Sequence, residues 1–331
     1  MKTKIFLLII LCLLLTACSS APDEYAQDFF AMDTFMSITA YGGNAEDGVK
    51  SAMRRISELE LKLSVTNKNS ELYAINRGEV GEDTAELVKF ALDIADRTGG
   101  ALDPTIYPVL RAWGFTTDEY RVPSPEEISA LLENVGHERV KVDGNTISTD
   151  EGMMLDLGAV AKGYAGDETE RILRENGVTS ALINLGGNIQ LVGSKPDGTD
   201  WRLGVKDPAG DGNIGVLTVS DCAVVTSGSY ERYFTADGKV YCHIIDPSSG
   251  YPADNGLLSV TIVADEGRLC DALSTALFVM GEERALEFWR ENKNFDVILI
   301  TDNAEVLITE GIADKFQLDG SHKNLKVVTV N

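Results

Sequence analysis

Residues 155–167 have the types and spacing needed to hold an anionic nucleotide. An apolar strand ends at Asp156, the chain turns on small residues, and a helix begins near Lys162. Gly158 and Gly163 allow close backbone approach, amides at a helix start attract phosphate, and Lys162 adds positive charge. An ordinary strand-to-helix connection capped by Asp156 would use the same residues. Other motifs must therefore decide between the two interpretations.

Asp271 and Thr275 are four residues apart on a predicted helix. This spacing places a carboxylate and a hydroxyl on one face, one turn apart. Hard oxygen ligands suit Mg²⁺, which keeps several waters and takes few protein ligands besides substrate phosphates. A solvated helix face would show the same pattern.

His243 lies in a predicted strand that leads into a turn, and Asp246 follows before a proline. A lone histidine is most often structural, but transfer of a phosphoryl group to a hydroxyl needs a proton acceptor. Residues 226–228 read Thr-Ser-Gly and lack the Gly-x-Ser-x-Gly pattern of serine hydrolases. Asp103 precedes a proline, where a turn carboxylate is common.

Six motifs in this order and spacing resemble the ApbE family of flavin transferases, which use FAD to attach FMN covalently to other proteins. They lie at residues 99–105, 155–167, 182–188, 226–230, 243–250 and 271–277, and the resemblance covers residues 29–318. It implies FAD contacts from Met32, Ala101, Leu102, Asp103, Asp156, Lys162 and Ile245. It implies a Mg²⁺ site formed by Asp271, Thr275 and the carbonyl of Ala159. As a hypothesis, His243 assists deprotonation of the acceptor hydroxyl and is oriented by Asp246 or Asp271, which gives His243, Asp246 and Asp271 as the catalytic set.

Two departures from the family pattern affect the flavin site. The chain has Met32-Asp33-Thr34 where the family usually has Met-Gly-Thr, which places a carboxylate near the expected flavin rim. Residues 64–72 are largely polar where relatives commonly carry an aromatic residue that stacks on the flavin. We therefore expect looser FAD binding and some hydrolysis of FAD to FMN and AMP.

The N-terminus is typical of an export signal. Lys2 and Lys4 precede an apolar run at residues 5–15 that is too short for a permanent membrane span. Residues 15–18, Leu-Thr-Ala-Cys, match a lipobox, which predicts removal of residues 1–17, lipidation of Cys18 and a tether over residues 18–28. The protein would then be anchored to the cell membrane, facing the periplasm or the exterior. A plain secretory peptide cleaved near Cys18 is the alternative.

The excess of acidic side chains and the small number of histidines and cysteines argue against nucleic-acid binding and a zinc site. Without residues 1–17 the chain has 27 basic and 52 acidic side chains and no visible Lys/Arg cluster, which argues against nucleic acid as a partner. Three histidines and no closely spaced cysteine pair argue against zinc. Cys222, Cys242 and Cys270 remain outside the N-terminal segment, and the sequence does not decide whether any two of them pair.

The elements that position these motifs alternate between helices and strands. Apolar spacing predicts helices at residues 45–63, 84–98, 125–135, 162–176, 271–280 and 282–291, with a hairpin at 140–147. Strands are predicted at residues 35–41, 180–184, 189–193, 201–206, 215–220, 223–226, 240–245, 257–264, 295–300 and 305–309. This pattern favours an α+β fold with largely antiparallel sheets and flanking helices. With the resemblance, it predicts one large ApbE-like, T-fold-like domain over residues 29–318, as one body or two lobes around a flavin cleft, and a tail over residues 319–331.

These inferences predict a Mg²⁺-dependent FAD:protein FMN transferase. It would attach FMN through a phosphoester bond to Thr or Ser of an exported or membrane redox protein and release AMP. The alternatives are a Mg²⁺-dependent FAD pyrophosphatase that uses the same site, and a flavin-binding lipoprotein without catalysis. The sequence does not identify the acceptor protein, the balance between transfer and hydrolysis, or the oligomeric state.

Overall fold

The computed structural model describes residues 23–75, 78–117 and 119–331. The predicted signal peptide, Cys18 and the first part of the predicted tether lie outside the described residues. Among the described helices, none is long and apolar enough to cross a membrane.

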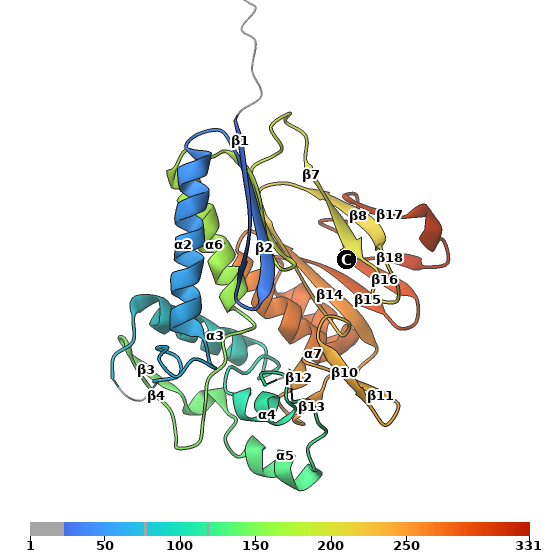
Figure 1. Ribbon diagram of the computed structural model, residues 1–331. Helices are drawn as coiled ribbons and strands as arrows, with labels where there is room; N and C mark the ends of the chain where they lie inside the picture. The colour runs from blue at the N-terminus through green and yellow to red at the C-terminus, as the bar shows by residue number, and fades with distance from the viewer. Residues whose placement is uncertain (1–22, 76–77, 118) are drawn as a thin grey trace, which may run out of the picture.

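A nine-stranded sheet forms the centre of the molecule (Figure 1). Its strands are antiparallel to their neighbours except for the last pair, β16 and β18, which is parallel. In spatial order they are β1 (Glu24–Ala31), β2 (Thr34–Tyr41), β5 (Ser180–Leu185), β6 (Asn188–Val192), β9 (Ala223–Gly228), β14 (Leu257–Ala264), β15 (Asp296–Thr301), β16 (Glu305–Thr309) and β18 (Lys326–Val330).

The two faces of this sheet have different covers. Side chains alternate along each strand, so Val225 and Ile262 join the larger apolar cluster while their neighbours Val224 and Val263 join a second one. The larger cluster lies under helices α2 (Ala45–Leu63), α6 (Ala161–Glu175) and α7 (Gly267–Glu291). The second lies under a small sheet of β17 (Phe316–Leu318), β8 (Asn213–Val219) and β7 (Trp201–Lys206). The observed fold is therefore α+β with mostly antiparallel sheets, as predicted.

A third apolar cluster lies at one end of the molecule (Figure 1). Trp113 and Phe115 form its centre, and the Trp113 indole N–H donates to the carbonyl of Gly250 at 2.9 Å. The elements of this region are α3 (Glu82–Arg97), α4 (Tyr107–Ala112), α5 (Pro125–Leu132), β3 (Lys141–Asp143), β4 (Thr146–Ser148), β10 (Tyr233–Ala236), β11 (Lys239–Cys242), β12 (Ile245–Asp246) and β13 (Tyr251–Pro252), with a short 3₁₀ turn at His137–Arg139. A second 3₁₀ turn, Gly320–His322, lies between β17 and β18.

Both predicted terminal segments are partly wrong. The predicted tether, residues 18–28, runs into β1, where Tyr25 and Phe29 pack against the core and every residue pairs with β2. The predicted tail, residues 319–331, contains β18, which pairs with β16 and buries Val330. In both segments pairing along the whole strand, with the neighbouring β2 or with β16, stabilises residues that their composition alone does not mark as a strand.

Interior elements differ from prediction mainly at their ends. The two predicted helices, 271–280 and 282–291, are both present under the single label α7 and are separated at Gly281, where φ is 78°, as predicted; the first begins four residues earlier than predicted. The predicted strand at 240–245 is divided into β11 and β12. Cys222, Cys242 and Cys270 are buried free thiols, so no disulfide joins them in the described chain.

Candidate functional site

Helices α6 and α7 approach each other closely at their N-terminal ends. A Cβ added to Gly163 would lie 2.3 Å from the carbonyl oxygen of Gly267, so only glycine fits there. The carboxylate of Asp167 accepts hydrogen bonds from the amides of Gly267 at 2.5 Å and Arg268 at 3.0 Å, which caps α7 from the neighbouring helix. These contacts fix the first turns of α7 beside the start of α6.

Asp271 is brought to the start of α6 by this packing. Its side chain is buried, and Oδ2 accepts a hydrogen bond from the amide of Gly163 at 2.9 Å. Burial raises the pKa of the Asp271 carboxyl, while the nearby Lys162 ammonium and the Gly163 amide act in the opposite direction. Asp271 is thus a buried carboxylate with a positive neighbour.

Thr275 lies one turn further along α7 and is half-buried. Its Oγ1 is 3.3 Å from Oγ of Ser227, on β9, and Ser227 Oγ is 2.8 Å from Oγ of the buried Ser274. The predicted pair of Asp271 and Thr275 therefore does not lie on a solvated helix face. It lies between α7, β9 and the start of α6.

The oxygens at this point fit a hard cation. Gly163 donates its amide proton to Asp271 rather than to the carbonyl of Ala159 four residues earlier, which leaves that carbonyl oxygen for another partner. A carboxylate, a hydroxyl and a backbone carbonyl form the kind of oxygen set that Mg²⁺ accepts. Among the described residues there is no group of three or more His, Cys, Asp or Glu side chains that could hold a metal, so Asp271 would be accompanied by neutral oxygens.

His243 lies within the electrostatic influence of Lys162, at the start of α6. Its Nδ1 is buried and has no hydrogen-bond partner among the described residues, and its ring meets Phe115 edge-on with centroids 6.4 Å apart. Burial, together with the positive charges of Arg232 and Lys162, lowers the pKa of His243 to about 4. The imidazole is therefore neutral at physiological pH and retains the ability to accept a proton.

The structure does not pair Asp246 with His243. Asp246 Oδ1 accepts from the amide and hydroxyl of Ser248, at 2.9 and 2.8 Å, and Oδ2 accepts from the hydroxyl of Ser249 at 3.2 Å. Asp246 thus organises the turn between β12 and β13, and Ile245 beside it is buried in the third apolar cluster.

Asp103 is likewise engaged within its own loop. Oδ1 accepts from the amide and hydroxyl of Thr105 at 2.8 and 2.6 Å, and Oδ2 lies 3.1 Å from both the amide and Nδ1 of His137. Ala101 and Leu102 are buried beside it. These contacts give Asp103 a structural role in joining residues 101–105 to the turn at 136–137.

Asp156 does not cap α6. Its Oδ1 accepts from the amide of Gly158 at 2.6 Å, and its own amide donates to the carbonyl of Pro104 at 2.7 Å. Burial raises the pKa of the Asp156 carboxyl, against the lowering effect of Arg232. Asp156 therefore connects the 155–160 turn with the loop of Asp103.

Met32 and Asp33 form the two-residue turn between β1 and β2. Their φ values of 48° and 57° are those of a turn in which Gly, Asn or Asp is favoured, which explains how Asp33 occupies a glycine position. The Met32 amide donates to Oε1 of Glu60 at 2.8 Å. The polar residues at 64–72 bond mainly to one another, as when the amide of Asn67 donates to Ser64 Oγ at 3.1 Å.

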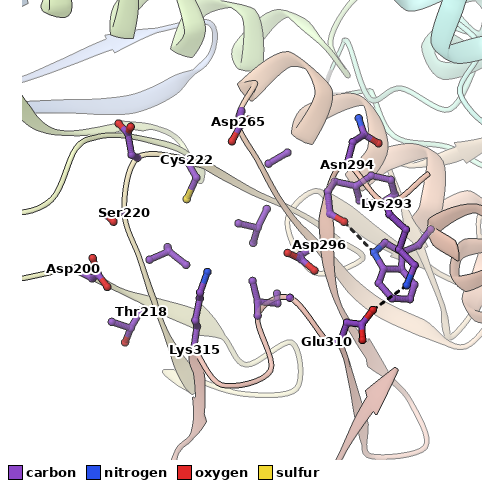
Figure 2. Close-up of a pocket in the computed structure, with 18 residues that line it drawn as sticks. Asp200, Thr218, Ser220, Cys222, Asp265, Lys293, Asn294, Asp296, Glu310 and Lys315 are labelled. Atoms are coloured by element: carbon purple, nitrogen blue, oxygen red, sulfur yellow. Dashed lines mark hydrogen bonds and ion pairs between the residues drawn. The ribbon is translucent and has the colours of Figure 1, made fainter. Parts of the chain in front are cut away.

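A cavity of about 570 Å³ lies outside this constellation (Figure 2). Lys293 and Glu310 both line it and form an ion pair at 3.2 Å, and the Lys293 ammonium lies 3.6 Å from the Trp289 ring centre. None of the predicted site residues lines this cavity.

Sequence reasoning missed the residues that hold the site in place. Ser227, Ser274 and Asp167 stand in the sequence only as members of the motifs, with no role of their own, and Gly267 lies in none of the motifs. Ser274 stands between the two predicted ligands, which is a usable signal, but nothing local to Asp167 indicates that it caps a helix 100 residues away.

Comparisons with known proteins identify the family of this chain. The family model described as the ApbE family matches residues 32–299. A relative named FAD:protein FMN transferase from Treponema pallidum is 32% identical over 323 residues, 89% of each chain, and one from Klebsiella pneumoniae is 36% identical over 77% of this chain and 82% of its own. The solved ApbE protein of Thermotoga maritima has a TM-score of 0.79 at 34% identity, over 92% of this chain and 99% of that one. The match over most of the chain, in sequence and in fold, shows that this protein is a member of the ApbE family.

Proposed function

We propose that this chain is an FAD:protein FMN transferase, an enzyme that moves the FMN part of FAD onto another protein. The relatives that match most of its length carry this name. The observation that supports it most is the buried Asp271 carboxylate, held by the Gly163 amide and adjoined by the Thr275 hydroxyl and the freed Ala159 carbonyl.

The proposed reaction exchanges the phosphoanhydride bond of FAD for a phosphoester bond to the acceptor protein. A Thr or Ser hydroxyl oxygen of the acceptor protein bonds to the FMN phosphorus of FAD, the bond from that phosphorus to the bridging oxygen breaks, and AMP leaves with that oxygen. Neutral His243 accepts the hydroxyl proton. Lys162 attracts the diphosphate to the start of α6, where helix amides favour negative charge.

Mg²⁺ fits the oxygens of Asp271, Thr275 and Ala159. Bound there, it would offset the charge that develops on the diphosphate oxygens as AMP departs. Asp271 contributes the only formal negative charge of that set, and Thr275 and Ala159 contribute neutral oxygens.

An anchored location outside the cytoplasm is part of the proposal. It rests on residues 15–18 and on the apolar run before them. The acceptor would then be an exported or membrane redox protein. Metabolic labelling with a radioactive fatty acid should mark the wild-type chain and leave Cys18→Ser unmarked, and equal labelling of both would reject lipidation at Cys18.

The test of the activity uses the full chain in detergent with FAD and Mg²⁺, with and without a flavin-acceptor domain. AMP is followed by chromatography and the acceptor by mass spectrometry. We expect an acceptor that gains one FMN for each AMP released. AMP and free FMN without an acceptor adduct would indicate an FAD pyrophosphatase, and no AMP under either condition would leave a flavin binder.

A further inference from the structure

Three hydroxyl groups from two elements form a connected chain next to Asp271. Ser227 Oγ, on β9, lies 2.8 Å from Ser274 Oγ and 3.3 Å from Thr275 Oγ1, both on α7. Ser274 Oγ in turn donates to the backbone carbonyl of Asp271 at 2.9 Å. Ser274 is completely buried, so bulk water does not replace these partners.

The direction of each hydrogen bond follows from the number of protons. A serine hydroxyl has one proton to donate and two lone pairs to accept with. Because Ser274 gives its proton to the Asp271 carbonyl, Ser227 must be the donor in the bond between the two serines. Ser227 then has no proton left, so Thr275 must donate in the contact between Ser227 and Thr275.

This direction matters for a hydroxyl that binds a cation. A hydroxyl coordinates a metal through a lone pair, and its proton must point away from the positive charge. An acceptor behind Thr275 holds the proton there and keeps the lone pairs of Oγ1 free, as the partners of metal ligands commonly do.

We propose that Ser227 is a positioning residue that orients the Thr275 hydroxyl for cation binding, through a relay that ends at the Asp271 carbonyl. The proposal rests on the proposed function, because it assumes that Asp271 and Thr275 bind Mg²⁺. It adds a residue on β9, outside that ligand set, whose hydroxyl sets the affinity of the site.

The neighbouring residue offers a matched control. Thr226 lies next to Ser227 on β9, but its side chain points to the opposite face of the sheet, where Oγ1 lies 2.8 Å from Thr261 Oγ1. Thr226→Val removes a half-buried hydroxyl from the same strand without touching the relay.

The experiment measures binding of Mn²⁺ alone to the full chain, by the electron paramagnetic resonance signal of the free ion. We expect Ser227→Ala to weaken Mn²⁺ binding about tenfold or more, as removal of a ligand's partner commonly does. Ser227→Thr, which keeps the hydroxyl, should bind within about twofold of wild type, and so should Thr226→Val. The melting temperature of each metal-free variant reports whether the fold is intact.

A second variant keeps the test valid if Ser227→Ala does not fold. Ser274→Ala frees the Ser227 proton, which then competes for a lone pair of Thr275, so Mn²⁺ binding should also weaken, though less than in Ser227→Ala. Binding of Mn²⁺ within about twofold of wild type in both alanine variants would overturn the relay, as would equal weakening by Thr226→Val. A wild-type chain that binds no Mn²⁺ would instead reject the metal site of the proposed function.

Discussion

Two neighbouring faces of helix α6 hold charged groups in opposite ways. Tyr164 and Glu168, one turn apart, face a network in which the Arg55 guanidinium binds both Asp83 and Glu168. Lys62 adds a 2.7 Å ion pair to Asp83, and the Tyr164 hydroxyl donates to Asp83 at 3.0 Å. These partners hold the pKa of Asp83 well below its usual range.

The other face of α6 carries Gly163 and Asp167 and meets α7. There the Asp271 carboxylate accepts a hydrogen bond from the Gly163 amide and has an ammonium nearby, and burial raises its pKa. His243 in the same region has a buried ring nitrogen without a partner.

The comparison separates stabilising charges from functional ones. In the Arg55 network each ionised group has opposite charges within bonding distance, so the network contributes to stability. At Asp271 the protein buries a carboxyl group with capacity left for a ligand, which costs stability and is the arrangement expected of the proposed functional site.

The largest expected effect tests the Asp271 side of this comparison. Asp271→Asn keeps the side-chain shape but removes the charge that a cation needs, so FMN transfer to an acceptor should fall about 100-fold or more. Because a desolvated carboxyl group is replaced by a neutral amide, the melting temperature of the metal-free protein should stay the same or rise. Transfer above half the wild-type rate, measured by acceptor mass, would contradict this role of Asp271.

The matching substitution on the other face should have the opposite outcome. Asp83→Asn leaves Arg55 and Lys62 without their shared carboxylate and should lower the free energy of unfolding by about 2 kcal/mol in urea denaturation. At a temperature where the variant stays folded, its transfer rate should remain within about twofold of wild type. If Asp83→Asn kept the free energy of unfolding of the wild type but lost FMN transfer, Asp83 would be a functional group and not a stabilising one, contrary to this comparison.

A smaller effect is expected in the pH dependence of transfer. Since the pKa of His243 is lowered to about 4, the imidazole stays neutral on lowering the pH from neutrality, and protonation of His243 should lower kcat/KM only near that value. Lys162→Met removes a positive charge that disfavours the imidazolium, so the acid limb should move to higher pH. The transfer rate is measured across the pH range, and far-UV circular dichroism at each pH checks that the protein is folded. An acid limb near the ordinary histidine pKa in the wild type would argue against a buried neutral base.

The smallest expected effect is at an exposed pair. Lys50 and Glu46 lie 2.6 Å apart on the surface of α2, where solvent screens their attraction. Lys50→Ala should leave the melting temperature unchanged. A decrease as large as that from Asp83→Asn would mean that burial does not distinguish the two kinds of pair.

Local patterns in the sequence predicted much of the fold and the centre of the site. Helical spacing gave α2 with the observed bounds, 45–63, and placed Asp271 and Thr275 on one face. Contacts between distant segments could not be predicted in this way, because they leave no periodic signal. The Asp167 cap on α7, the close approach of Gly163 to Gly267 and the pairing of β18 with β16 are of this kind.

The motifs also did not show which carboxylates already accept hydrogen bonds from their own loops. Asp103 and Asp246 lie in the expected motifs, but hydroxyl and amide groups two residues later occupy their oxygens. An Asp followed two residues later by Thr or Ser is a common turn pattern, and that signal was present in both loops.

The most direct measurement compares the mass of a flavin-acceptor domain after incubation with FAD, Mg²⁺ and either the wild-type chain, Asp271→Asn or Asp83→Asn. The account predicts an acceptor that carries one FMN with wild type and with Asp83→Asn, and an unmodified acceptor with Asp271→Asn. An acceptor modified equally by all three proteins would contradict the claim that the Asp271 face of α6 is the reaction centre.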